Sequence, residues 1–201
     1  MLIIANRQID KLIVKNTDDY RSSIRSSVRG AWTGTYDYVD FLDAMFIAID
    51  RGFTQAWDEG MSEYGMSLAD ATFEERARLQ GEILNERQYV SGYADYIAGN
   101  AKGKNKLATV MQRGELWANA YDRIRQLAKM YAARDEPQKW QMNMAEHCSS
   151  CIVLNGKVKR ASYWKEHITP RSWGLKCHSN CHCELIPTSE PLSRGALPGG
   201  F

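Results

Sequence analysis

Apolar side chains recur every three or four residues along three long stretches of the chain, at 39–60, 73–97 and 106–133. This spacing places them on one face of an α-helix, so the pattern predicts three long amphipathic helices. A shorter helix is expected over 18–32. We interpret the aromatic residues in these stripes as core positions. The defining apolar residues of the three stretches are Phe41, Leu42, Met45, Phe46, Ile49, Phe53, Ala56, Trp57; Phe73, Ala77, Ile83, Leu84, Val90, Tyr93, Ala94, Ile97; and Leu107, Val110, Met111, Trp117, Tyr121, Ile124, Leu127, Ala128, Tyr131.

Local signals predict where these helices end. Thr72 stands three residues before Glu75, the spacing of a capping box, so a helix should begin at about residue 73. Gly60 is expected to stop the first long helix, and Pro137 to close the helical series. The segment 98–106 contains two glycines and two asparagines and is expected to be a solvated basic loop.

The composition is that of a soluble globular protein. The chain has 201 residues, 44% of them hydrophobic and 25% charged, with a net charge of +2. No run approaches the roughly 20 apolar residues that a membrane span needs. The first sixteen residues lack the apolar segment and cleavage site of a signal peptide. We therefore expect a protein made in a cytosol, with no membrane span.

The five cysteines are confined to one part of the chain. None occurs in the first 147 residues, and all lie in Cys148-Ser-Ser-Cys151 or in Cys177-His-Ser-Asn-Cys181-His-Cys183. Paired thiols followed by a second cluster are typical of a tetrahedral zinc site, and a reducing cytosol favours bound metal over disulfides. We assign Cys148 and Cys151 as ligands. The other two places are left open between Cys177, His178, Cys181 and Cys183. The alternative is a set of buried free thiols without metal.

The residues around the first cysteine pair suggest a small metal-stabilised fold. Asn155-Gly156 is a strong turn dipeptide, and the apolar residues 152–154 and Val158 flank it. We expect a short β-hairpin there, as in a zinc ribbon or knuckle. Metal binding would supply folding free energy and hold the loop from Pro170 to Cys183 against Trp140 and Trp164.

The segment 188–201 is rich in proline, glycine and serine, so it should be ordered only by lying on another surface. We expect it to reach a partner.

Two other interpretations concern nucleic acids. Residues 148–201 carry seven Lys or Arg against three acidic residues, so the module could contact DNA through a weak basic set consisting of Lys157, Lys159, Arg160 and Lys176. The phrase Glu166-His-Ile-Thr-Pro170 is similar to the start of an HNH nuclease core, with His167 as its catalytic residue. Only six residues separate Pro170 from Cys177, which leaves no room for the rest of that core.

The second half of the chain resembles the phage Mu F-like minor head proteins, also called head morphogenesis proteins. The resemblance runs from about Ser91 to Pro187. It rests on the order and spacing of Arg113-Gly-Glu-Leu-Trp-Ala118, Trp140, Cys148-Ser-Ser-Cys-Ile-Val-Leu-Asn-Gly156 and the stretch from Pro170 through Cys177, Cys181 and Cys183. Ser179 and His182 depart from the proline and arginine of many relatives. The first ninety residues match only in their helical character.

The resemblance implies a structural role in the head of a tailed phage. Such proteins associate with the portal or major capsid protein and can contact packaged double-stranded DNA. The chain would be made in the host cytoplasm and end in the virion. We therefore expect a mainly α protein without enzymatic activity. It should have a helical body at 1–140, with three long helices and a shorter one, an α+β zinc module at 141–187 and an extended tail at 188–201.

Overall fold

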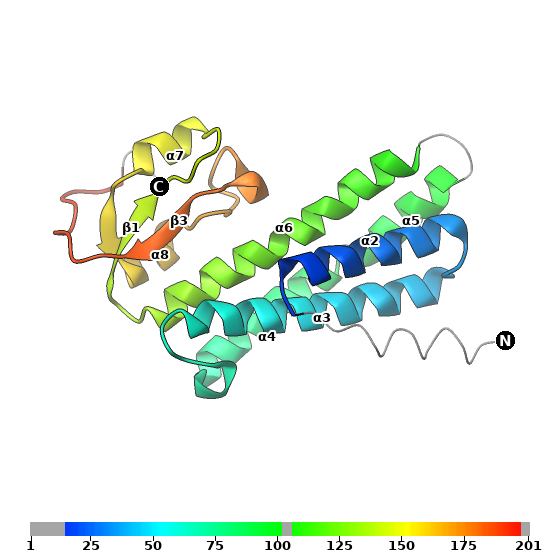
Figure 1. Ribbon diagram of the computed structural model, residues 1–201, viewed down its shortest axis with the longest axis horizontal. Coiled ribbons are helices and arrows are strands. Elements are labelled where there is room, and N and C mark those ends of the chain that lie inside the picture. The colour runs from blue at the N-terminus through cyan, green and yellow to red at the C-terminus, as the bar shows by residue number, and fades with distance from the viewer. Residues whose placement is uncertain (1–14, 102–105, 198–201) are drawn as a thin grey trace. The chain divides into compact units, whose positions relative to one another are not determined.

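The computed structural model describes residues 15–101 and 106–197, which form two compact units (Figure 1). Within the described chain, unit 1 consists of residues 15–56 and 71–121. Unit 2 consists of residues 57–70 and 122–197. The first fourteen residues, where no signal peptide is expected, lie outside the described residues, as do Lys102 and Lys104 of the basic loop. The fold is mainly helical with a small antiparallel sheet, which confirms the expected fold class.

Unit 1 is built from helices. Its elements are α2 (Thr17–Thr33), α4 (Phe73–Arg87), α5 (Val90–Ala101), and the parts of α3 (Tyr38–Ser62) and α6 (Leu107–Ala132) that belong to this unit. Helix α2 begins at Asn16, whose side chain accepts hydrogen bonds from the backbone N–H groups of Asp18 and Asp19 at 3.0 Å. It packs against α5. The three expected long helices thus appear as α3, α6 and the pair α4–α5.

The core of unit 1 is aromatic, as the stripes predict. Tyr20, Phe41, Phe53, Tyr93 and Tyr121 are all buried. The ring of Tyr93 stacks on Trp117 with centroids 4.6 Å apart, and its hydroxyl donates to the carbonyl of Val110 at 2.7 Å. Because the hydroxyl is satisfied, burying this ring does not leave an unpaired polar group.

The capping box at the start of α4 is confirmed. The backbone N–H of Thr72 donates to Glu75 Oε2 at 2.6 Å, and the N–H of Glu75 donates to Thr72 Oγ1 at 3.3 Å. The single helix expected over 73–97 is wrong, because the chain breaks after Arg87 and resumes at Val90. The apolar stripe does not reveal this break, since Ile83 and Val90 are seven residues apart, two helical turns.

Three residues of that expected stripe are not core residues. Phe73, Ala77 and Leu84 are exposed, whereas Leu79 and Ile83 are buried on α4.

The prediction that Gly60 stops the first long helix is also wrong, since α3 continues to Ser62. An added Cβ at Gly60 would lie 2.4 Å from the carbonyl oxygen of Arg125, so this glycine permits close contact between α3 and α6 within unit 2.

Unit 2 contains a three-stranded antiparallel sheet with strand order β2-β1-β3. Strand β1 (Pro137–Gln141) pairs with both β2 (Val158–Arg160) and β3 (Glu184–Pro187). The remaining short elements are η1 (Leu68–Asp70), α7 (Ser149–Leu154), α8 (Ala161–His167) and η2 (His178–Asn180). Pro137 opens β1, a position where its missing N–H is tolerated.

The hairpin expected around Asn155-Gly156 is wrong. Residues 152–154 belong to α7, and β2 pairs with β1 instead. Helix α7 buries Cys151 and Leu154, three residues apart, and exposes Ile152 and Val153. A short apolar run of this kind does not distinguish a strand from a helical turn. The turn itself is present, with Gly156 at a φ of 76° and its N–H donating to the carbonyl of Trp140 at 2.8 Å.

The described part of the tail, residues 188–197, lies on unit 2 itself (Figure 1, red). The N–H of Ser193 donates to the carbonyl of Val158 at 2.9 Å, and the N–H of Val158 donates to Ser193 Oγ at 3.0 Å. Leu197 is buried in the core of the unit. The tail is therefore ordered by the surface of β2, as its composition requires, and its reach to a partner stays a prediction.

Candidate metal centre

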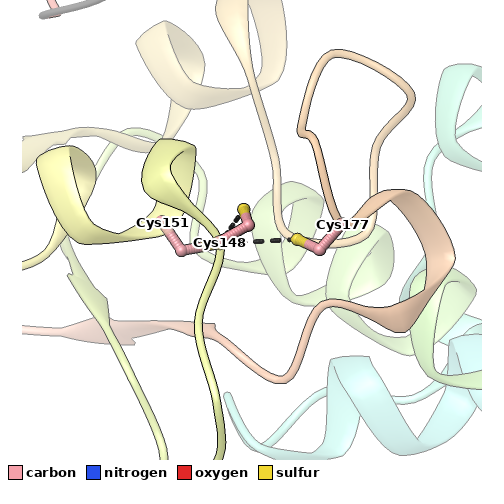
Figure 2. A group of neighbouring side chains, drawn as sticks. All are labelled: Cys148, Cys151 and Cys177. Atoms are coloured by element: carbon pink, nitrogen blue, oxygen red, sulfur yellow. Dashed lines mark hydrogen bonds between the residues drawn. The ribbon is translucent and has the colours of Figure 1, made fainter.

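The first cysteine pair is positioned by the start of α7. Cys148 is the N-cap residue and Cys151 lies in the first turn, where the N–H of Ile152 donates to the carbonyl of Cys148 at 3.1 Å. This single turn brings the two thiols together, with sulfur atoms 3.6 Å apart. In Figure 2 the side chain of Cys177 approaches the pair from a different segment.

Backbone hydrogen bonds in the η2 turn fix the position of the second cysteine cluster. The N–H of Asn180 donates to the carbonyl of Cys177 at 3.0 Å, and the N–H of Cys181 donates to that of His178 at 3.2 Å. His178 has a φ of 46°, in the left-handed region that non-glycine residues rarely adopt. Cys183 follows immediately before β3. The turn therefore places Cys181 in the hydrophobic core of unit 2, with Cys177 packed against that core.

The structure brings all five predicted cysteine ligands together. Cys151 Sγ lies 3.6 Å from that of Cys148, 3.6 Å from that of Cys177 and 3.5 Å from that of Cys181. The sulfurs form two triads, each mutually within 4.8 Å: Cys148, Cys151 and Cys177, and Cys151, Cys181 and Cys183. Two thiolates bound to one tetrahedral zinc at ~2.3 Å lie about 3.8 Å apart, so the measured distances fit thiolate coordination.

The cluster sits in the hydrophobic core of unit 2. Cys151, Cys181 and Cys183 are fully buried, while Cys148 and Cys177 are partly exposed. The surrounding core includes Trp140, Trp164, Leu154, Ile168, Leu175 and Leu185. The two indole rings are 5.5 Å apart, and Trp164 Nε1 donates to the carbonyl of Gln138 at 2.9 Å. The loop preceding Cys183 thus packs with both tryptophans, as expected from the sequence.

One thiol in each triad has a pKa below its ordinary value. Burial acts to raise the pKa of Cys148, but the nearby backbone of Cys151 and the thiol of Cys177 outweigh it and lower that pKa to about 7. The Cys183 thiol lowers the pKa of Cys181 to about 5 against the effect of burial. Burial raises the pKa of Cys151 to about 12 and also raises that of Cys177. Interaction with Cys181 raises the pKa of Cys183.

The histidines occupy places that sequence spacing did not predict. His178, a candidate ligand, belongs to neither triad, and its ring lies 5.3 Å from that of Trp173. His147, which the sequence interpretation overlooked, has its Nδ1 3.6 Å from Cys183 Sγ. Its Nε2 lies 2.6 Å from the carbonyl oxygen of Asn143. Its position immediately before Cys148 was the only signal available.

The structure places His167 away from the cysteine triads. Its ring stacks on Tyr163 with centroids 3.9 Å apart, and its Nδ1 lies 2.9 Å from the Tyr163 carbonyl oxygen. Within residues 15–101 and 106–197, neither group capable of holding a metal includes His167 or Glu166. The chemistry available at the centre is thiolate coordination, extended by one nearby imidazole.

The four candidate DNA-binding residues have different surroundings. Lys159 is buried, and its ammonium donates to the carbonyls of Ser193 and Gly195 at 2.8 and 2.5 Å, so it stabilises the tail. Arg160 is exposed and pairs with Asp135 at 3.4 Å. Lys157 is half-buried and Lys176 is exposed. DNA binding by the three other than Lys159 stays a prediction.

Arginine side chains line a separate groove in unit 1. It has a volume of about 690 Å³, and Arg21, Arg25 and Arg29 of α2 line it with Asp18 and Glu115. Glu115 pairs with Arg25 at 2.5 Å and with Arg21 at 3.3 Å. Part of this positive charge is therefore neutralised within the protein.

Comparisons with protein-family models, with curated proteins and with solved structures find no match for this chain. Among the helices of the described residues, none has both the length and the apolar character needed to cross a bilayer.

Proposed function

We propose that unit 2 is a structural zinc module in which thiolates of the cysteine cluster hold the metal. The observation that carries this proposal is the convergence of Cys148 and Cys151 with Cys177 and Cys181, 26 to 30 residues later in the chain, at sulfur distances of 3.5–3.6 Å. Thiolate is the ligand class that zinc prefers in structural sites. Bound zinc would supply a fixed crosslink between α7 and the η2 turn.

The surroundings favour a structural over a catalytic role. A catalytic zinc needs a position open to substrate, usually with a general base beside it. Three of the five thiols are fully buried among tryptophan and leucine side chains. The sheet of unit 2 is small, with strands of three to five residues. A bound ion would therefore supply much of the folding free energy of the part of unit 2 that contains this sheet and the cysteine cluster.

The test is zinc analysis of the full chain, purified without chelators, together with thermal unfolding. We expect about one equivalent of zinc or more per chain, and less bound zinc with lower thermal stability in Cys148→Ser. Ser149→Ala changes the exposed neighbouring residue and should retain the metal. Less than about half an equivalent in the wild type, with Cys148→Ser as stable as the wild type, would sink the proposal.

We further propose that the chain is a non-enzymatic minor head protein of a tailed phage, with unit 2 docking on a portal or capsid surface. The support is the resemblance in motif order from Arg113-Gly-Glu-Leu-Trp-Ala118 through Trp140 to the cysteine clusters. An exposed tryptophan, Trp173, lies in the loop that leads to Cys177, and tryptophan is over-represented where proteins bind one another.

This second proposal is tested by co-expression with the portal and major capsid proteins encoded in the same genome. We expect the chain to co-purify with one of them and to be present in assembled heads. Trp173→Ala should weaken that association without changing the zinc content. If the chain purifies alone in the presence of both partners and is absent from heads, the proposed role is incorrect.

A further inference from the structure

We infer that the cysteine cluster binds two zinc-class ions joined by the Cys151 thiolate, with His147 as a sixth donor. This inference rests on the proposed zinc module and adds to it a second ion and a ligand outside the two cysteine motifs. Its evidence is the grouping of the sulfurs, the geometry of His147 and the different exposure of the two triads.

The grouping of the sulfurs favours two coordination centres. A single tetrahedral ion would gather four donors in one group with equal edges. The five thiols instead fall into two triads that share Cys151, and a contact between the Cys177 and Cys181 thiols links the two groups further. Cys151 lies 3.5–3.6 Å from sulfurs of both triads, close to the ligand spacing expected around each ion. A thiolate with that neighbourhood is placed to bridge two metals.

His147 lies beside one thiol of the second triad, although it is not itself a member of that group. Its Nδ1 is 3.6 Å from Cys183 Sγ, and a nitrogen and a sulfur bound to one tetrahedral zinc lie about 3.5 Å apart. Its Nε2 is 2.6 Å from the Asn143 carbonyl oxygen, which can only accept a hydrogen bond. Nε2 therefore donates to this carbonyl, and Nδ1 is the ring nitrogen that faces the Cys183 thiol. Metal-binding histidines usually make this kind of outer contact.

The two proposed centres then differ in the number of protein ligands that each ion has. Cys151, Cys181, Cys183 and His147 supply four donors to one ion, which is the full set for a structural zinc. Cys148, Cys151 and Cys177 supply three to the other ion, and two of these residues are partly exposed. That ion would complete its coordination with water or another solvent ligand. We expect the three-thiol centre to exchange its metal faster than the buried one.

The experiment is native mass spectrometry of the full chain loaded with Zn²⁺, which counts ions per molecule. We expect two ions in the wild type. His147→Ala should weaken binding of one ion by roughly tenfold or more. His167→Ala removes an exposed histidine of the same unit that lies outside both triads, and it should still bind two ions. Cobalt(II) titration of the wild-type chain should saturate its thiolate absorption at two equivalents.

The outcomes separate this inference from the module on which it rests. One ion in the wild type, with cobalt absorption complete at one equivalent, would overturn the two-ion centre and leave the structural zinc in place. Two ions held equally tightly by His147→Ala and the wild type would overturn the role of His147. Absence of any bound ion would refute the zinc module and this inference together.

Discussion

The close contact between α3 and α6 in unit 2 gives a prediction whose size can be worked out. A Cβ added at Gly60 would lie 2.4 Å from the carbonyl oxygen of Arg125, 2.7 Å from the Cβ of Ala128 and 3.1 Å from the backbone nitrogen of Lys129. Two of these three neighbours are backbone atoms, which move only if the helix moves. Gly60→Ala should therefore force the two helices apart.

Two opposing effects set the magnitude. Replacing glycine by alanine inside a helix stabilises it by about 1 kcal/mol through backbone entropy. Overpacking of a close contact costs about 1–3 kcal/mol and occasionally more. The overlap at Gly60 is severe and involves backbone, so the upper part of that range applies. We expect a net loss of about 1–2 kcal/mol of unfolding free energy.

Gly81 is the matched control for this substitution. It lies inside α4, and an added Cβ there meets no atom within 4 Å. Gly81→Ala should therefore be stabilising by about 0.5–1 kcal/mol. In a chain of this size 1 kcal/mol shifts the melting temperature by about 2–4 °C, which circular dichroism resolves. A Gly60→Ala variant that melts at or above the wild-type temperature would refute the close approach of these helices.

Three further predictions concern local contacts. Lys159→Met removes the ammonium that donates to the carbonyls of Ser193 and Gly195, so limited proteolysis should cleave the tail faster; an unchanged rate would contradict that anchoring role. Thr72→Ala removes a helix cap and should cost about 1 kcal/mol in thermal unfolding; no loss would count against the capping box. Burial raises the pKa of Tyr64 to about 12, so its contribution to stability is present below pH 10 and is lost as the pH rises through 12. Alkaline unfolding of Tyr64→Phe should be less steep over that interval than that of the wild type, and identical curves would rule out this contribution.

The helical part of the fold was largely predictable because its signals are local. A stripe such as Phe41, Met45, Ile49 and Phe53 repeats over several turns, and such a long periodic pattern has one simple solution. The capping box needs only Thr72 and three following residues. These features depend on contacts within a few residues along the chain.

The errors arose where distant residues decide the structure. Gly60 has the sequence signature of a helix stop, yet its role depends on Arg125, 65 positions later. Residues 152–154 form a short apolar run whose helical state follows from burial of Leu154 in the core of unit 2. Lys159 looked like a surface cation because its partners in the tail are more than thirty residues away.

The candidate site was predictable only in part, because some of its contacts are local in sequence and others are distant. Cysteine spacing identified all five thiols that the fold brings together. The division into two triads could not be foreseen, because it depends on how the η2 turn faces α7. His147 was missed because its contact with Cys183 spans 36 residues, although it directly precedes Cys148.

Hydrogen–deuterium exchange with and without metal tests whether a bound ion organises the cysteine-rich part of unit 2. The full chain would be compared in its zinc-loaded form and after chelation. We predict that chelation accelerates exchange in peptides covering 148–185, while those covering α4 and α5 remain unchanged. Equal protection of the 148–185 peptides in the two forms would show that a bound ion does not organise this part of unit 2.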